Sequence, residues 1–368
     1  MSKTERNILE NNKGKRVWIG MSGGVDSSVS ALLLKQAGFN VTGVFIKVWQ
    51  PENGRCTWKD ERRDAMRVAA HLDIPFLTFD FGEKYKKEVV DYMIFEYKQG
   101  RTPNPDVMCN RHIKFGSFLD AAREAGVDYV ATGHYAQNIL NTNGIFELKE
   151  GKDKNKDQSY FLWTLPQEDL RRVLFPIGHL EKSEVRKIAE QNGLPVFDKK
   201  DSQGICFLGH VDMKEFLKEY IDVQKGNVID IKGNIIGEHD GALLYTIGER
   251  HGFKLVNITP DQHAKYVIAK NIEANTLTVA EYTDEVTEQM PRVATIDNIS
   301  WTKGVGPNPT TNLGARLRYR QQKQPCTILP LICGYKVLFQ DPQKALTPGQ
   351  SLVLYDGEVC LGGGILIQ

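Results

Sequence analysis

Short apolar runs alternate with amphipathic stretches over residues 16–135. The runs RVWIG, FNVTGVFIKV, IPFLTFDF and DYVATGH have the length and composition of strands. The stretches between them, SSVSALLLKQAG, DERRDAMRVAAHL and KFGSFLDAAREAG, repeat apolar residues at helical spacing. This alternation predicts an α/β domain in which helices flank a parallel sheet.

A few local signals predict where elements end. The first helix carries its apolar residues on one stripe, and Gly38 can take the left-handed conformation that ends a helix. We expect this helix to begin directly after a loop at 21–28.

Asn143-Gly144, between NIL and IFEL, predicts a type I′ hairpin, and the lysine-rich segment after it predicts a solvated loop that projects from the sheet domain.

The pattern changes in the second half of the chain. Helical patterns return at 158–193, but beyond about residue 212 short strands and glycine turns follow one another. From about residue 278 to the end, apolar segments recur at the spacing of a small all-β barrel. The sequence therefore predicts three domains: an α/β catalytic domain at 1–211, a small, mostly β central domain at 212–277 and a C-terminal β-barrel at 278–368.

Composition limits the class of protein. The chain has 368 residues, of which 41% are hydrophobic and 25% charged, as in globular proteins. A net charge of +1 means that any nucleic-acid contact must come from local basic patches. The first fifteen residues do not resemble a signal or transit peptide, and no apolar run is long enough to span a bilayer. Six cysteines without a CxxC pair suit a reducing compartment, so we expect a cytoplasmic protein without membrane contact.

A glycine-serine loop joins the first predicted strand to the first helix. Its glycines let several N–H groups converge on an anion, and its serines and the helix N-terminus add donors and positive charge. The candidate ATP-binding residues here are Gly20, Met21, Ser22, Gly23, Gly24, Val25, Asp26, Ser27 and Ser28. Because no lysine follows the glycines, cleavage between the first and second phosphates is favoured over transfer of the terminal phosphoryl group. Asp26 could help to hold Mg²⁺, or it could merely cap the helix. The loop resembles the PP-loop of ATP pyrophosphatases.

The first candidate thiol is Cys109, three residues after Asp106. Two prolines predict an extended loop here, on which carboxylate and thiol can face one substrate. Asp106 could then move a proton on a substrate base. Nearby cations lower a thiol pKa, and three candidates follow at once: Arg111, His112 and Lys114.

The second candidate thiol is Cys206, in DSQGICF. Lys199 and Lys200 supply positive charge near it in sequence. Taken alone, either cysteine is more often a small buried hydrophobe than a catalyst. The other four are interpreted as structural or incidental: Cys56, Cys326, Cys333 and Cys360.

Five motifs taken together resemble a known family. SGGVDSS, NPDVMCN, ATGHYA, KDQSYFL and DSQGICF occur in the order found in the bacterial tRNA-specific 2-thiouridylases, and the resemblance covers essentially the whole chain. It implies that ATP adenylates the 2-carbonyl of the wobble uridine, that sulfur from a Cys206 persulfide replaces the oxygen, and that AMP and pyrophosphate leave. Cys109 would be the partner nucleophile, forming a transient disulfide with Cys206, and Asp106 the acid or base.

The resemblance also implies binding residues and partners. Ile46 and Gly133 would border the adenine and ribose. The tRNA-binding residues would be Asn104, Pro105, Asp106, His134, Lys156, Asp157, Gln158, Arg318, Tyr319 and Gln350. The partners would be tRNAs for lysine, glutamate and glutamine, together with a sulfur-carrier protein or cysteine desulfurase relay.

The tRNA-binding residues also have structural interpretations. Arg316, Arg318 and Arg320 alternate along a predicted strand, so they share one face that suits phosphate contacts, with Tyr319 on the other face. The alternative is a solvated strand. His134, at the end of a strand, could instead be a hydrogen-bonded packing residue.

Three alternatives to this function stay open. One is a PP-loop amide-forming synthetase, which needs no thiols. Another is an iron-sulfur cluster held by Asp106, Cys109 and Cys206, which would bind sulfide in place of a persulfide. The third is a non-enzymatic RNA-binding protein that keeps a decayed nucleotide fold.

Overall fold

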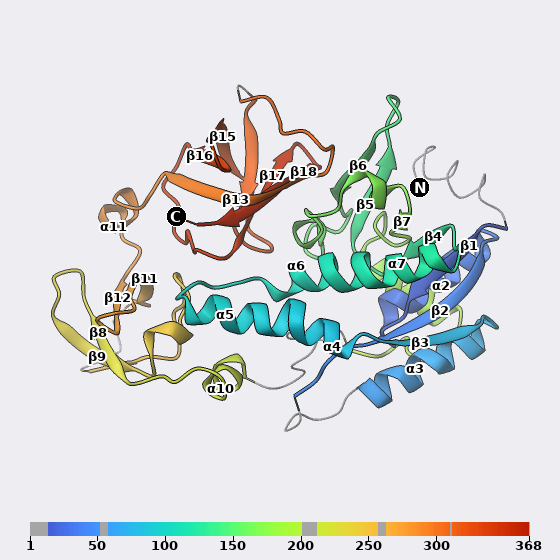
Figure 1. Cartoon of the computed structure of the whole chain (residues 1–368), viewed down its shortest axis with the longest axis horizontal. Helices are drawn as coiled ribbons and strands as arrows, with labels where there is room; N and C mark the ends of the chain where they lie inside the picture. The colour runs from blue at the N-terminus through green and yellow to red at the C-terminus, as the bar shows by residue number, and fades with distance from the viewer. Residues whose placement is uncertain (1–13, 52–57, 201–211, 257–262, 310, 368) are drawn as a thin grey trace.

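The computed structural model describes residues 14–51, 58–200, 212–256, 263–309 and 311–367. They form a parallel sheet with its helices, a small central domain and a closed barrel (Figure 1). This confirms the predicted fold class. No helix among the described residues is long and apolar enough to cross a membrane.

The N-terminal sheet is parallel throughout. Its order is β3 (Phe76–Asp80), β2 (Asn40–Lys47), β1 (Arg16–Gly20), β4 (Tyr129–Ala131) and β7 (Val173–Leu174). The two-residue strand β7 lies in a stretch that the sequence pattern predicted to be helical. Such a short strand leaves no periodic signal.

Helices flank this sheet, and further helices lie in the later parts of the chain. They are α2 (Val25–Gln36), α3 (Trp58–His71), α4 (Gly82–Tyr85), η1 (Lys86–Asp91), α5 (Tyr92–Lys98), α6 (Pro105–Cys109), η2 (Asn110–Ser117), α7 (Phe118–Glu124), η3 (Ser159–Phe161), α8 (Gln167–Leu170), α9 (Lys182–Gln191), α10 (Met213–Lys218), η4 (Ala242–Leu244) and α11 (Asp284–Glu288). Helix α2 begins at Val25, inside the loop predicted at 21–28, so that expected start was wrong. Gly38 has a φ of 85°, as predicted for the end of this helix.

The predicted hairpin at Asn143-Gly144 forms, but its turn type differs from the prediction. It joins β5 (Ala136–Leu140) to β6 (Phe146–Glu150). Gly144 has a φ of 76° whereas Asn143 keeps a negative φ, so the turn is not type I′. The turn at residues 142–144 is exposed and projects outward, as predicted (Figure 1), while β6 pairs with the barrel near its other end through Lys149 and Val359.

The barrel closes on itself. Its order is β13 (Val293–Trp301), β16 (Tyr335–Phe339), β15 (Gln324–Pro330), β14 (Leu313–Arg316), β17 (Ser351–Asp356) and β18 (Val359–Leu366), and β13 pairs with β18. The central domain has a sheet of β10 (Lys254–Leu255), β9 (Ile235–His239), β8 (Gly226–Ile229), β12 (Thr276–Ala280) and β11 (Tyr266–Asn271).

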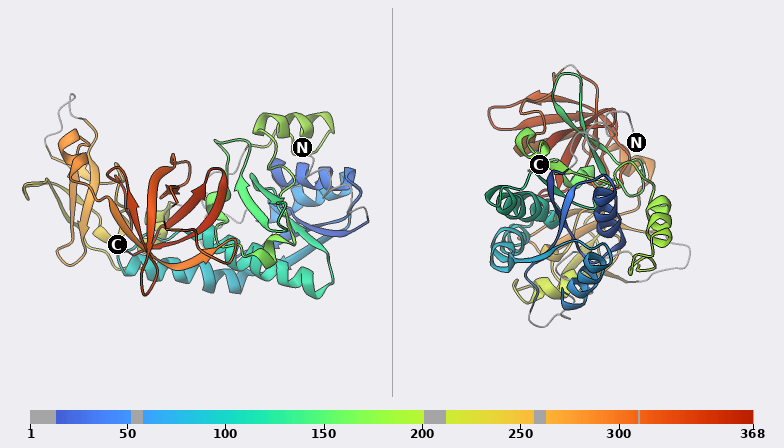
Figure 2. Two further views of the ribbon diagram at one scale, coloured as in Figure 1. Left: turned by 90° about the horizontal axis from the view of Figure 1, so that it is seen from above. Right: turned by 90° about the vertical axis from the view of Figure 1, so that its right-hand side faces the viewer.

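Long helices tie the three parts together. Helix α5 and the continuous helix formed by α6, η2 and α7 run from the parallel sheet toward the central domain, alongside the barrel (Figures 1 and 2). One apolar core includes residues of all three parts: Val44, Met108, Phe216, Tyr245, Val353 and Ile365. The helix that carries Cys109 therefore belongs to a core that continues into both later domains.

Candidate active site

The glycine-serine loop is shaped by its own hydroxyl groups. Ser28 is fully buried, and its hydroxyl donates to the Gly24 carbonyl at 2.7 Å, so it supports the loop. The backbone N–H of Ser22 donates to the Ser27 hydroxyl at 3.3 Å, and the two hydroxyls lie 3.4 Å apart. Ser22 is exposed. Ser27 is buried, and its hydroxyl also bonds to the Gly24 carbonyl at 3.3 Å, so Ser22 is the exposed serine of these three.

Two glycines allow close approaches that a side chain would block. Gly23 has a φ of 73°, and a Cβ there would lie 2.4 Å from the Glu61 carbonyl oxygen. A Cβ on Gly133 would lie 2.8 Å from the backbone nitrogen of Ser27. The end of β4 is therefore pressed against the first turn of α2, which fits the compact anion-binding nest expected of this loop.

Asp26 is not a helix cap. Gly24 occupies the N-cap position, and no side chain caps the helix there. The Asp26 carboxylate instead accepts hydrogen bonds from the Lys182 ammonium at 2.7 and 2.8 Å and from the Tyr135 hydroxyl at 2.7 Å. The interpretation of Asp26 as a cap was therefore wrong. A cation from the start of α9 already lies at the phosphate loop.

A second lysine also reaches this loop. The Lys199 ammonium donates to the Gly23 carbonyl at 3.0 Å and pairs with Asp64 at 2.8 Å. The sequence pattern had linked Lys199 with Cys206, which lies outside the described residues. Within the described residues its contacts stabilise the left-handed turn at Gly23.

Cys109 and Asp106 share a helix, not the extended loop expected from the two prolines. Pro105 occupies the first turn of α6, and the Asn104 side chain caps it by accepting from the Val107 N–H at 3.3 Å. The prediction failed because proline is favoured at the first helical position, where its missing N–H costs nothing. Residues three apart on a helix lie on one face, so carboxylate and thiol are neighbours, as expected.

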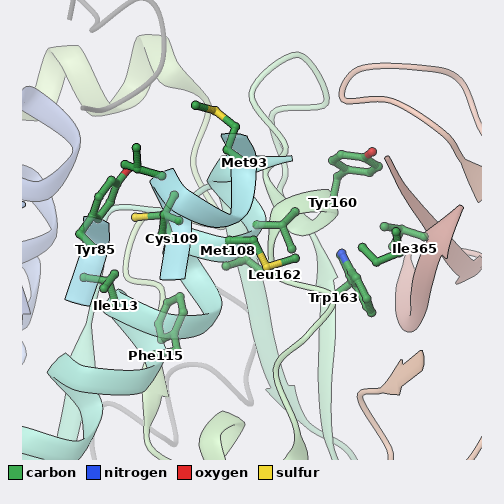
Figure 3. Packing of buried hydrophobic residues seen from close by; sticks show 14 of the residues in the cluster. Tyr85, Met93, Met108, Cys109, Ile113, Phe115, Tyr160, Leu162, Trp163 and Ile365 are labelled. Carbon is green, nitrogen blue, oxygen red and sulfur yellow. The ribbon is translucent and has the colours of Figure 1, made fainter. Parts of the chain in front are cut away.

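The Cys109 thiol and the Asp106 carboxyl are largely buried. Cys109 is 5% exposed and packs in the large core, where Figure 3 shows it with Tyr85 and Ile113. Burial raises the pKa of the Asp106 carboxyl, and the positive charge of Lys114 offsets part of that rise. A carboxylate with a raised pKa is a stronger base near neutral pH, which suits proton transfer.

The three side chains predicted to place positive charge near Cys109 differ in their charge and exposure. His112 lies 3.9 Å from Glu88, and burial, aided by the charge of Arg111, lowers the pKa of its imidazole. His112 therefore does not supply a fixed positive charge. Arg111 is exposed, and Lys114 is half-buried on η2.

His134 lies at the centre of the site and is not exposed to solvent. Its Nδ1 is 2.7 Å from the Thr132 hydroxyl, and its Nε2 is 3.5 Å from the Lys114 ammonium. Burial, aided by the Lys114 charge, holds the pKa of the imidazole well below its ordinary value. The rings of Phe115 and Phe175 enclose it.

The segment 156–158 lies where it joins the sheet domain to the barrel. Gln158 exchanges hydrogen bonds with the backbone of Tyr135, and Lys156 is half-buried. Asp157 is 3% exposed, and its carboxylate accepts from the Arg316 guanidinium at 2.5 Å. The solvated loop expected after the hairpin was thus wrong, because this acidic residue has a partner 159 positions away.

The prediction that Arg316, Arg318 and Arg320 share one face of a strand was also wrong. Strand β14 ends at Arg316, and Arg320 has a φ of 63° in the turn that follows. Arg316 is buried with Glu150 and Asp157. The Arg318 guanidinium bonds to the Ile247 carbonyl of the central domain. Only Arg320 of the three is exposed.

The two remaining barrel residues lie beside the Cys109 helix. The side-chain amide of Gln350 donates to the carbonyls of Thr102 and Pro103 at 2.9 and 3.0 Å. The Tyr319 ring lies 4.7 Å from that of Phe161. Of these two residues, Gln350 therefore contacts the segment that leads into α6.

The other cysteines differ from one another. Cys326 and Cys360 are buried in barrel strands, and burial raises the pKa of each thiol to about 12. Cys333 is exposed in the turn between β15 and β16. Cys56, like Cys206, lies outside the described residues.

The sequence interpretation missed Lys182 as part of the phosphate loop. A search for lysine directly after the glycines excludes it, since it comes 156 positions after Asp26. The sequence feature that could have indicated it is its position. Lys182 is the first residue of a helix in the same α/β domain, and a side chain there can reach the edge of the sheet that carries the loop.

Comparison with known proteins gives consistent matches along the chain. Family profiles described as tRNA methyl transferase HUP domain, tRNA methyl transferase PRC-barrel domain and aminomethyltransferase beta-barrel domain match residues 15–210, 214–281 and 292–366. A protein named tRNA-specific 2-thiouridylase MnmA from Francisella tularensis subsp. mediasiatica is 46% identical over 359 residues, covering 96% of this chain and all of the relative. One of the same name from Lacticaseibacillus paracasei is 45% identical over 362 residues, covering 98% of this chain and 96% of that relative. A solved U34-tRNA thiolase from Methanococcus maripaludis is 17% identical, with a TM-score of 0.36 over 58% of this chain and 68% of that one, too distant to carry an argument.

Proposed function

This chain belongs to the tRNA-specific 2-thiouridylase family, and we propose that it catalyses ATP-dependent 2-thiolation of the wobble uridine in tRNA. One structural observation carries the proposal. The segment Thr132–Tyr135 touches both the phosphate loop and the Cys109 helix, since Gly133 lies on Ser27 while His134 lies beside Lys114. A nucleotide phosphate and a base next to Asp106 would therefore share one site.

The first step activates the uridine. Its 2-carbonyl oxygen attacks the α-phosphorus of ATP, the bond from that phosphorus to pyrophosphate breaks, and the N3 proton passes to the Asp106 carboxylate. A urea-like carbonyl is a poor electrophile, so joining its oxygen to AMP creates a good leaving group. The raised pKa of Asp106 makes it a suitable acceptor for that proton.

The second step delivers sulfur. The terminal sulfur of a Cys206 persulfide attacks C2, and the C2–O bond breaks to release AMP. The Cys109 thiolate then attacks the inner sulfur, forming a disulfide with Cys206 and leaving 2-thiouridine, whose N3 recovers a proton from Asp106. This places sulfur on the base and oxidises two thiols to a disulfide, which a cellular reductant must reopen.

Residues of the phosphate loop fit ATP and Mg²⁺. Ser22, Ser27 and the start of α2 would hold the phosphates, with Ile46 and Gly133 beside the nucleoside. Mg²⁺ supplies charge neutralisation when bound, and the Asp26 carboxylate would help to hold it. Among the described residues no three His, Cys, Asp or Glu side chains are grouped as a metal site.

The proposed partners follow the family. They are tRNAs for lysine, glutamate and glutamine and a sulfur-carrier protein or cysteine desulfurase relay, in the cytoplasm. The tRNA would contact the surface around Asn104, Arg318, Tyr319 and Gln350.

Mass spectrometry of nucleosides tests this function. Full-length protein is incubated with tRNA, ATP, magnesium and a persulfide donor, a cysteine desulfurase with free cysteine, and the wobble uridine is expected to gain about 16 Da as oxygen is replaced by sulfur. Cys109→Ser and Cys206→Ala are expected to lose the product. A protein that binds tRNA but neither thiolates it nor forms AMP contradicts the proposal, and AMP formation that needs neither cysteine supports an amide-forming synthetase.

The same preparation tests the iron-sulfur alternative. On the persulfide route, anaerobically purified protein is colourless and carries an extra sulfur on Cys206. Visible absorbance that depends on Asp106, Cys109 and Cys206 would instead indicate a cluster.

A further inference from the structure

Lys114 is a half-buried cation on η2. Its ammonium lies 3.5 Å from His134, and in the part of the chain that the structure describes no carboxylate is within ion-pair distance of it. Buried charges in proteins are normally paired. A lysine held in this way keeps donors that a negatively charged ligand can use.

The proton positions on His134 follow from its neighbours. An ammonium can only donate, so the Nε2 that faces Lys114 must accept, and the proton of the neutral ring is then on Nδ1. That Nδ1–H donates to the Thr132 hydroxyl at 2.7 Å. Because burial keeps this imidazole neutral, His134 orients the Lys114 ammonium without cancelling its charge.

The π-helix η2 affects the direction in which Lys114 points relative to Asp106 and Cys109. Asp106 and Cys109 lie on α6, but Lys114 lies on η2, a π-helix that follows without a break. A π-helix turns less per residue than an α-helix, because its hydrogen bonds run from i to i+5, and such segments occur at functional sites. Lys114 is close enough to Asp106 to lower the pKa of that carboxyl.

His134 links Lys114 to the phosphate loop. It directly follows Gly133, which is pressed onto the first turn of α2 at Ser27, and its ring faces the Lys114 ammonium. The same ammonium lies close enough to Asp106 to lower the pKa of that carboxyl. In the proposed reaction, the oxygen that joins C2 of uridine to the phosphate of AMP lies between the phosphate loop and Asp106.

We propose that Lys114 is a catalytic residue, whose ammonium contacts the oxygen between uridine C2 and the AMP phosphate. The inference rests on the proposed function. As sulfur attacks C2, the C2–O bond electrons pass to the departing AMP phosphate, and Lys114 stabilises that charge by hydrogen bonding. It transfers no proton, since AMP leaves as an anion. His134 is a positioning residue, because it acts through Lys114.

Lys114→Met tests the assignment in the full-length protein with tRNA, ATP, magnesium and a persulfide donor, a cysteine desulfurase with free cysteine. Removing one such electrostatic contact typically lowers the rate by about 100-fold or more. We therefore expect K114M to slow 2-thiouridine formation to that extent at saturating tRNA and ATP, while its Kd for tRNA changes by less than about threefold. Lys114→Arg is expected to recover part of the rate, and His134→Asn to lie between wild type and K114M.

Lys87→Met is the matched control, since Lys87 is an exposed lysine on η1. It is expected to leave the rate unchanged. A K114M rate within about threefold of wild type, or a loss that saturating tRNA restores, overturns the assignment. Should K114M bind neither ligand, Lys114→Gln is judged by the same criteria. A wild-type protein that makes no 2-thiouridine overturns the proposed function itself, and this inference with it.

Discussion

The side-chain amide of Gln350 donates a hydrogen bond to the Pro103 carbonyl, 247 positions earlier in the chain, at 3.0 Å. A second bond to Thr102 fixes the same segment. The barrel thereby holds the residues that lead into α6, the helix of Asp106 and Cys109. The C-terminal domain is part of the framework of the active site as well as a candidate surface for RNA.

Gln350→Ala should therefore impair the reaction more than the fold. Each lost hydrogen bond costs about 1 kcal/mol, but freeing the start of α6 misplaces Asp106. We expect kcat to fall by about tenfold or more, with a smaller change in the KM for tRNA. Gln324→Ala, in the same barrel, removes a side-chain hydrogen bond to the nearby Gln322 carbonyl and should leave kcat unchanged. An effect on KM alone would mean that Gln350 only binds tRNA.

Arg316→Met should destabilise the junction between barrel and sheet domain. The guanidinium lies 2.8 Å from Glu150 and 2.5 Å from Asp157, and both carboxylates are almost fully buried. Removing one partner of a buried ion pair costs about 3–5 kcal/mol. Denaturant unfolding measures this cost. Arg292→Met, which breaks an exposed pair with Glu288, should cost about 1 kcal/mol or less, and equal costs for the two variants would contradict the account.

The same junction should weaken in acid. Burial alone would raise the pKa of Glu150, but hydrogen bonds from Lys323 and Lys154 and the charge of Arg316 lower it overall. A carboxyl whose folded pKa lies below its unfolded value stabilises the fold above the unfolded value, 4.5 for glutamate, and loses that stabilisation as pH falls through the folded one. Unfolding free energy should drop below about pH 4.5 less steeply in Glu150→Gln than in wild type.

The Asp106 carboxyl should affect the pH dependence of stability in the opposite direction. Burial raises the pKa of its carboxyl, so the charged form costs stability at neutral pH and the cost disappears in acid. Asp106→Asn should therefore be at least as stable as wild type at pH 7 while losing thiolation. The gain in unfolding free energy should shrink as pH approaches the ordinary aspartate value of 3.8. A variant that is less stable at pH 7 would contradict the stated cause of the pKa shift.

Lys182→Met should weaken nucleotide binding. Its ammonium lies on Asp26 at the phosphate loop, where an incoming polyphosphate would find it. Loss of a charge-assisted contact of about 1.5–3 kcal/mol predicts an increase in the Kd for ATP of about tenfold or more, measurable by calorimetry. Lys187→Met is the control, because that lysine is exposed on the same helix α9. Equal affinities in all three proteins would remove Lys182 from the site.

The sequence predicted what depends on local pattern. The α/β class, the barrel and the placement of the phosphate loop between β1 and α2 follow from apolar periodicity and glycine chemistry, and the structure confirms them. The extended loop expected at Pro103 to Asn110 was wrong, because proline both ends elements and begins helices, and sequence alone does not say which.

Contacts between distant residues were not predictable in the same way. Asp157 is polar and follows a lysine-rich stretch, so solvent exposure was expected, but its partner Arg316 belongs to another domain. Alternation from Arg316 to Arg320 suggested a strand, whereas the chain turns at Arg320 with a positive φ. Lys182 reaches the phosphate loop only because the fold brings α9 beside α2.

In the proposed reaction, ATP activates the 2-carbonyl oxygen of uridine in the site between the phosphate loop and the Cys109 helix. This step can be followed by thiolating tRNA that carries ¹⁸O at that oxygen. We predict that the label leaves on AMP, raising its mass by about 2 Da. Unlabelled AMP, with ¹⁸O appearing in water while 2-thiouridine forms, would contradict it.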